Sequence, residues 1–262
     1  MPDLPHFLAA GAGSLVGFTL ALVGGGGSIL AVPLLVYLVG IANPHVAIGT
    51  SAVSVAVNAA ISLVGRARSG AVKWRCIAVF TTMGVIGAFV GSFFGRQFDG
   101  EALLALFAVL MIVVGALMLR KGEDEGEPSV RLSKDNFPKL VVYGFGTGLL
   151  SGFFGIGGGF LIVPGLIAAT GMPIWNAMAS SLFAVMSFGV TTAGSYAWAG
   201  LVDWGIAGFF IAGGFIGGIL GTRTAKNLQT RRGALTRVFA LLIFAVAAYM
   251  LYEAASGMLR LR

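Results

Sequence analysis

The chain has 262 residues, of which 57% are hydrophobic and only 10% are charged. Soluble domains carry about 25% charged residues, so this chain has too little polar surface to cover a water-exposed globule. Its net charge of +7 would suit a nucleic-acid binder, but Lys and Arg stand at the ends of apolar segments, as membrane topology requires. The composition therefore predicts an all-α polytopic membrane protein that contacts the lipid bilayer and no nucleic acid.

Long apolar blocks predict the spanning helices, because about 20 residues at 1.5 Å each cross the hydrocarbon. Eight blocks share this character, and in chain order they are about 7–39, 45–65, 75–95, 101–119, 140–170, 174–199, 205–222 and 233–256. Two of them, 7–39 and 140–170, are too long for one ordinary span. We therefore expect a first membrane repeat at 1–119, a charged cytoplasmic linker at 120–139, and a second membrane repeat at 140–262. Each repeat has a broken segment followed by three spans.

The two repeats are related in sequence. Residues 24–33 read GGGGSILAVP, and residues 155–164 read GIGGGFLIVP at an offset of 131 residues. Further matches follow in the same order at an offset of 130 residues, and they pair Thr50-Ser51 with Ser180-Ser181 and Gly84, Gly87 and Gly91 with Gly214, Gly217 and Gly221. A constant order and a nearly constant offset indicate an internal duplication.

The positive charges predict that the repeats are inverted. The loop 65–75 carries four Lys or Arg residues, whereas its match 199–204 carries none. The loop 95–100 carries one, whereas its match 222–237 carries five. If both long blocks double back, fourteen basic residues share one side and three the other; if each crosses once, the split is eleven and six. The positive-inside bias favours the first arrangement, with both termini outside the cytoplasm.

The glycine runs break the two long blocks and suggest a binding site. Consecutive glycines favour a turn over a continued helix, and irregular backbone at membrane depth occurs where it is buried in protein or lines a wet cavity. A helix that starts there presents free N–H groups and a positive dipole end, which attract anions. Hydroxyl and amide side chains in the next apolar block add donors. The predicted substrate-binding residues are Gly24, Gly25, Gly26, Gly27, Ser28, Thr50, Ser51, Asn58, Gly155, Gly157, Gly158, Gly159, Ser180 and Ser181.

Each of these residues also has a structural interpretation. Small residues let membrane helices approach closely, which is how we interpret Gly87-xxx-Gly91 and Gly213-xxx-Gly217-xxx-Gly221. The hydroxyls could equally join helices by hydrogen bonds, and for Asn58 we favour that role. The basic residues Arg66, Arg68, Lys73 and Arg75 are interpreted as topology anchors, with a cytoplasmic funnel that steers anions as the alternative.

The residues that are scarce exclude other functions. All ten acidic residues lie in loops or near span ends, which argues against a cation substrate and a buried carboxylate proton relay. Two His and one Cys do not make a metal site, and no Gly-x-Ser-x-Gly elbow supports a serine nucleophile. We therefore expect no enzyme activity, no metal and no cofactor.

The motifs resemble the sulfite exporter TauE/SafE family. The resemblance rests on the Gly-rich break before Pro33, on Asn43-Pro44 with Gly49-Thr50-Ser51, and on the second copy from Gly155 to Pro164 with Ser180-Ser181. It covers nearly the whole chain. It implies a carrier in the bacterial inner membrane that moves a small sulfur-containing anion, such as sulfite or a sulfonate, usually outward.

The leading hypothesis is a secondary transporter of such an anion that works by alternating access. Within transport, an anion channel or an uptake permease for another small organic anion remains open. A non-transporting membrane scaffold is the alternative from another class. The substrate, the direction, the coupling ion and a homo-oligomeric state are left open by the sequence.

Overall fold

The computed structural model describes residues 3–68, 70–120, 130–155, 159–227 and 244–252, and these residues form helices and the loops between them. Five helical segments of this part of the chain are long and apolar enough to cross a membrane, namely Leu4–Leu38, Pro44–Ala67, Trp74–Gly95, Ile174–Trp198 and Trp204–Thr224. The protein is therefore an all-helical, multi-pass membrane protein, as its composition predicts.

The helices follow the predicted blocks closely. Their bounds are α1 Leu4–Val23, the 3₁₀ helix η1 Gly24–Leu30, α2 Ala31–Pro33, the π-helix η2 Leu34–Leu38, α3 Pro44–Ala67, α4 Trp74–Gly95, α5 Gly100–Arg120, α6 Phe137–Phe154, α7 Gly159–Thr170, α8 Ile174–Trp198 and α9 Trp204–Asn227. Residues 244–252 are also helical, inside the predicted block 233–256. The stretch 121–129 of the predicted linker lies outside the described residues.

The chain doubles back at the first glycine run. Gly24 has φ +72°, a left-handed conformation that glycine adopts without penalty, and the backbone at Gly27 packs directly on Thr19 and Leu20. In a straight helix, residues eight positions apart would be about 12 Å apart. The run is not a plain turn, because Gly24–Leu30 coils into 3₁₀ helix after the reversal.

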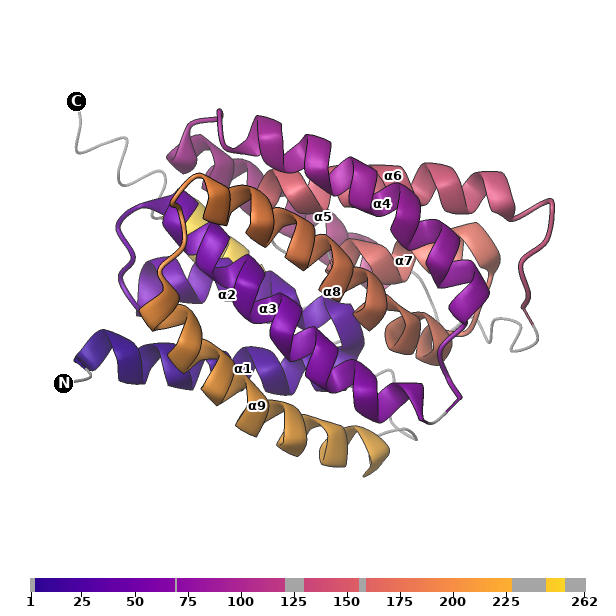
Figure 1. The fold of residues 1–262 in the computed structure, drawn as a ribbon, viewed down its shortest axis with the longest axis horizontal. Helices are drawn as coiled ribbons and strands as arrows, with labels where there is room; N and C mark the ends of the chain where they lie inside the picture. Colours follow the sequence, from indigo (N-terminus) through magenta and orange to yellow (C-terminus); the bar gives the residue numbers. More distant parts are fainter. Residues whose placement is uncertain (1–2, 69, 121–129, 156–158, 228–243, 253–262) are drawn as a thin grey trace.

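The second glycine run begins in the same way. Gly155, which ends α6, has φ +67°, and α7 starts at Gly159. Residues 156–158, including the predicted site residues Gly157 and Gly158, lie outside the described part of the chain. Matching helices run in opposite directions: α1 and α3 run from left to right in Figure 1, whereas their counterparts α6 and α8 run from right to left.

Helices α3 and α8 pass through the middle of the molecule, with α1 and α9 below them and α4 and α6 above them in Figure 1. Glycines bring the outer pairs together. Between α1 and α9, a Cβ on Gly221 would lie 2.5 Å from the carbonyl oxygen of Phe18, and between α4 and α6, a Cβ on Gly144 would lie 2.5 Å from that of Phe80. Gly87, Gly91, Gly213 and Gly217 also face partner backbone, as the packing interpretation predicts. Each pair joins one helix from each half of the sequence.

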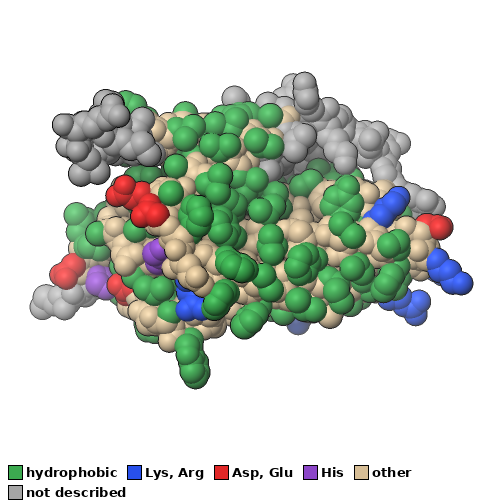
Figure 2. Space-filling model, turned by 90° about the horizontal axis from the view of Figure 1, so that it is seen from above, with side chains coloured by type: hydrophobic (Ala, Val, Ile, Leu, Met, Phe, Trp, Pro, Cys, Tyr) green, Lys and Arg blue, Asp and Glu red, His purple; other side chains and the backbone are tan. Residues whose placement is uncertain are grey.

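The outer surface suits a bilayer. Hydrophobic side chains spread across the face seen in Figure 2, with most Lys and Arg toward one end and most Asp, Glu and His toward the other. Trp74, Trp198 and Trp204 are exposed at helix ends, where indole rings anchor membrane proteins to the interface.

Candidate functional site

The two broken segments meet in the interior of the protein. All residues of Gly24–Leu30 are buried. A Cβ on Gly25 would lie 2.6 Å from Cα of Gly159 and 2.7 Å from Cγ2 of Val185, so no side chain fits between the breaks. The sequence analysis assigns Gly25 and Gly159 to one binding site, and the structure brings the two glycines into direct backbone contact.

A serine from the opposite half holds each break. The Gly25 N–H donates to Ser181 Oγ at 3.0 Å, and Ser181 Oγ in turn donates to the carbonyl of Met178 at 2.8 Å. On the other side, Ser51 Oγ lies 2.8 Å from the carbonyl oxygen of Ile48 and 3.4 Å from that of Gly155. These two predicted residues therefore join α3 and α8 to the breaks of the other repeat.

The neighbouring hydroxyls, of Thr50 and Ser180, form hydrogen bonds with loops rather than with the breaks. Thr50 Oγ1 accepts the Asp203 N–H at 2.9 Å, and Ser180 Oγ accepts the Lys73 N–H at 2.9 Å. The two loops match each other in sequence. Thr50 and Ser180, which also match, therefore each accept a hydrogen bond from the loop of the opposite half. Both side chains are fully buried.

Within the first break, Ser28 has a local partner. Its Oγ donates to the carbonyl of Gly25 at 2.9 Å, which closes a turn of the 3₁₀ helix. Gly26 and Gly27 are buried in the same turn. The first backbone N–H groups of a helix have no acceptor within that helix. The start of the 3₁₀ helix therefore offers backbone N–H donors to other groups, and the Gly25 N–H already donates to Ser181 Oγ.

Asn58 lies apart from the breaks, on the side of α3 that faces α9. It is 2% exposed, neither its Nδ2 nor its Oδ1 has a hydrogen-bond partner, and it lies against Gly214. The sequence analysis favours Asn58 as a hydrogen-bonding link between helices, but its side chain bonds no other helix among the described residues. An unpartnered buried amide is rare and calls for a functional or solvent explanation.

Asn58 belongs to a polar stripe along α3. Residues spaced by three or four share one face of a helix, and the buried polar residues at this spacing are Ser51, Ser54, Asn58, Ser62 and Arg66. The stripe begins beside the break at Ser51 and ends at the last turn of α3. Polar and ionisable residues inside a membrane protein make this stripe a candidate functional site.

Arg66 is a correction to the sequence analysis, which placed it in a basic loop as a topology anchor. It belongs to α3 and is 6% exposed. Its Nη2 donates to the carbonyl oxygens of Ala21 and Leu22, and its guanidinium lies 4.7 Å from the centroid of the Trp175 ring. A cation at the carboxyl end of a helix is favourable, so Arg66 caps α1 immediately before the Gly24 break.

The sequence is similar to those of known membrane transporters. The family model of the sulfite exporter TauE/SafE matches residues 9–250. A probable membrane transporter protein of Xylella fastidiosa (strain Temecula1) is 50% identical over 248 residues, covering 93% of this chain and 94% of the relative. The probable membrane transporter protein YunE of Bacillus subtilis is 26% identical over 264 residues, covering 92% and 95%. No solved structure matches the chain.

Proposed function

Because the chain belongs to the sulfite exporter TauE/SafE family of membrane transporters, we propose that it is a secondary transporter that exports a small sulfur-containing anion, such as sulfite or a sulfonate. The proposed location is a bacterial inner membrane. The family and the membrane fold are established by the match over nearly the whole chain, and the substrate and the direction are the proposal.

The observation that carries this proposal is the meeting of the two breaks. Gly25 and Gly159 touch, and Ser51 and Ser181 add hydroxyls from both halves at the same place. Broken helices from two repeats that meet inside the membrane are a recurring site in secondary transporters, because their N-terminal ends attract anions. In the present conformation the two backbones are in contact, so a solute enters between them only when they separate.

The α3 stripe supports an anionic substrate. It leads from Ser51 at the break, past the unpartnered amide of Asn58, to the guanidinium of Arg66. Arg66 supplies a buried positive charge near the first break, because its guanidinium bonds the carbonyl oxygens of Ala21 and Leu22, which precede the break in the chain by three and two residues. Hydroxyls, an amide and a guanidinium are all hydrogen-bond donors, which an oxyanion requires.

We further propose that the halves are inverted in the membrane. Matching helices run in opposite directions in Figure 1, and matching loops carry opposite charge character. Inverted repeats place the site at their interface and let it open to either side in turn. In this layout the loop between α3 and α4, residues 68–73, and the segment 222–237 face the cytoplasm, and both termini lie outside it.

Counterflow in proteoliposomes tests the transport proposal. Vesicles are preloaded with sulfite, sulfoacetate, taurine or thiosulfate, and uptake of the same labelled anion is followed; saturable uptake with stimulation from inside is expected for at least one. Flat traces for every anion would refute the proposal, and uptake that does not saturate would indicate a channel.

Matched glycine variants tie the transport to the break. Gly24→Ala and Gly40→Ala both force alanine into a left-handed conformation, with φ +72° and +85°. Only Gly24 has close neighbours, because a Cβ there would lie 2.6 Å from the carbonyl oxygen of Met178. Gly24→Ala is therefore expected to abolish counterflow, and Gly40→Ala to retain it. Equal counterflow activity of the two variants would remove the break from the transport mechanism.

A further inference from the structure

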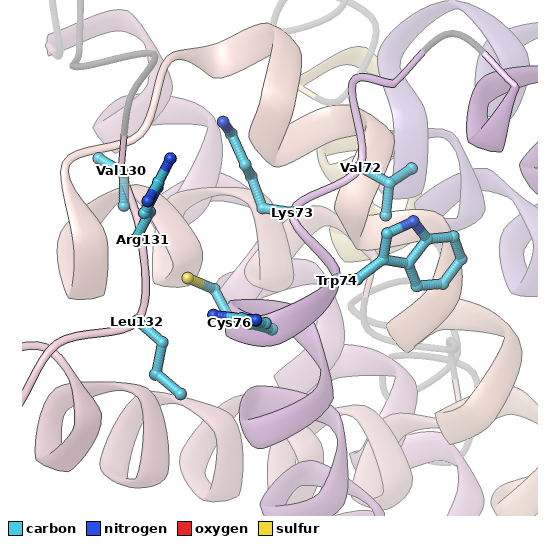
Figure 3. A pocket seen from close by; sticks show the side chains of 8 residues that line it. Val72, Lys73, Trp74, Cys76, Val130, Arg131 and Leu132 are labelled. Atoms are coloured by element: carbon cyan, nitrogen blue, oxygen red, sulfur yellow. The ribbon is translucent and has the colours of Figure 1, made fainter.

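A cavity of about 410 Å³ opens at the start of α4, away from the two breaks. One wall is formed by the end of the 68–73 loop and the first turn of α4, and the other by residues 130–132 (Figure 3). Much of this lining lies in connecting segments, outside the spanning helices. The cavity therefore faces the water layer beside the membrane rather than the hydrocarbon.

The side chains that line the cavity combine positive charge with apolar surface. Lys73, Arg75 and Arg131 bring three cations to it, and no Asp or Glu belongs to the part of the lining that the structure describes. Figure 3 shows the Lys73 and Arg131 side chains rising on the same side of the cavity. Three like charges in one concave surface focus a positive potential, which raises the local concentration of anions.

The apolar part of the lining narrows the class of ligand. Val72, Val130 and Leu132 add hydrocarbon surface between the cations. The cavity is also far larger than a water molecule, whose share of liquid volume is about 30 Å³. A bare inorganic oxyanion would leave this apolar surface uncovered, whereas an oxyanion on a short hydrocarbon chain would cover it and gain affinity with each buried CH₂.

Hydrogen bonds connect the cavity wall to the break. The Lys73 N–H donates to Ser180 Oγ, and Asn176 Nδ2 donates to the carbonyl of Ala71 at 2.8 Å. Ser181, the residue after Ser180, accepts the N–H of Gly25 at the break. The loop that carries Lys73 is thus fastened to the helix that holds the first break.

The matching loop of the other half has the opposite character. Asp203 and Gly205 occupy the positions that match Lys73 and Arg75. The loop is fastened in the same way, through the Asp203 N–H and Thr50 Oγ1, but it offers an anion a negative charge instead of a positive one. An anion is therefore attracted at one of the two fastened loops and repelled at the other.

We propose that this cavity is a collecting site for a soluble organic oxyanion with a short apolar chain, of the alkanesulfonate type, at the α4 mouth of the transport path. The proposal rests on the proposed function, since it assigns the ligand to the transported class. It adds a second binding site, distinct from the breaks, and a physical reason for loading from one side.

Binding of a ligand to the full-length protein provides the test, because Cys76 in the cavity wall is only 1% exposed and too buried to serve as a reporter thiol. The Cys76 sulfur points toward the segment that carries Arg131 and Leu132 (Figure 3). In full-length protein purified in neutral detergent, binding of butanesulfonate is measured by isothermal titration calorimetry. Saturable binding is expected. The midpoint of thermal unfolding is a second readout, and butanesulfonate should raise it.

Lys73→Gln combined with Arg131→Gln should abolish both effects, whereas Arg223→Gln, an exposed cation on α9, should leave them intact. Each variant is compared with itself, with and without ligand. Absence of both effects in the unmodified protein would overturn the proposal. Effects produced by phosphatidylglycerol but not by butanesulfonate would assign the cavity to lipid and overturn it as well. Ligand effects with flat counterflow would leave the binding site standing and refute the transport function instead.

Discussion

Gly25→Ala tests the contact between the two breaks with a single methyl group. Gly25 is not one of the described glycines that have a positive φ, so alanine fits its backbone conformation. The added Cβ would lie 2.6 Å from Cα of Gly159, 2.7 Å from Cγ2 of Val185 and 2.8 Å from the carbonyl oxygen of Gly159. Carbon atoms in good contact are about 3.5–4.0 Å apart, so the two breaks must separate by about 1 Å.

The cost of that separation can be stated from packing. Overpacking a well-packed interior by one methyl group costs about 1–3 kcal/mol, which lowers the population of the closed contact by about 5- to 150-fold, since 1.4 kcal/mol is tenfold. If the transport cycle passes through the closed contact, the counterflow rate falls by a factor in that range. Stability of the purified protein falls by the same free energy.

Gly11→Ala is the matched control. Gly11 lies in α1, and a Cβ there would meet no atom within 4 Å. Alanine in place of glycine inside a helix adds about 0.5–1 kcal/mol of stability. We expect Gly11→Ala to transport like the parent protein and to unfold at a slightly higher denaturant concentration. The reasoning fails if Gly25→Ala and Gly11→Ala have the same unfolding midpoint and the same counterflow rate.

Three other tests address the hydroxyls, the stripe and the topology. Thr50→Val and Ser180→Ala each remove the acceptor of a part-buried N–H, of Asp203 and Lys73, so each should cost about 0.5–1.5 kcal/mol in denaturant unfolding; parental stability of the double variant would contradict this. Arg66→Ala should cost about 1.5–3 kcal/mol, because charged donors to two α1 carbonyls are lost; Arg66→Lys should recover part of it, since Lys donates but has no planar group for Trp175. Equal midpoints for the two Arg66 variants would contradict that role. In a Cys76→Ala background, Arg68→Cys and Arg223→Cys should react with an impermeant thiol reagent from the same side of the membrane, and Trp198→Cys, at a position 94% exposed, from the other side; labelling of positions 68 and 223 from opposite sides would rule out the inverted layout.

Asn58→Ala separates a structural role from a transport role. Both polar atoms of Asn58 lack partners, and removing an unsatisfied buried amide gives back about 1–3 kcal/mol of desolvation penalty. We expect the variant to be at least as stable as the parent protein and to lose counterflow activity. A variant that is destabilised and transports normally would show that Asn58 serves packing alone.

The apolar pattern predicts the helices well because membrane thickness fixes their length. The predicted blocks 45–65, 75–95 and 174–199 correspond to α3, α4 and α8 with ends that differ by one or two residues. The glycine runs also locate the reversals at Gly24 and Gly155, since few other residues adopt a positive φ. These features depend on local composition, which a sequence displays directly.

Contacts between distant segments are harder to predict. Arg66 reads as a loop residue because it follows the apolar block, and its burial depends on the α1 carbonyls and Trp175, which are remote in sequence. One signal was available: Ser51, Ser62 and Arg66 fall on one face of α3, so helical periodicity extends the polar stripe to the arginine. The substrate-binding role of the glycines and hydroxyls stays a prediction.

The pairing of α1 with α9 has a consequence for how the protein is made. Ribosomes release α1 first and α9 almost last, so the glycine surface of α1 has no partner while most of the chain is synthesised. Helices α4 and α6, by contrast, become available close together. We expect the α4–α6 pair to assemble during insertion and the α1–α9 pair to close only after synthesis of α9, so that a chain truncated before residue 204 leaves its first helix exposed to quality-control proteases.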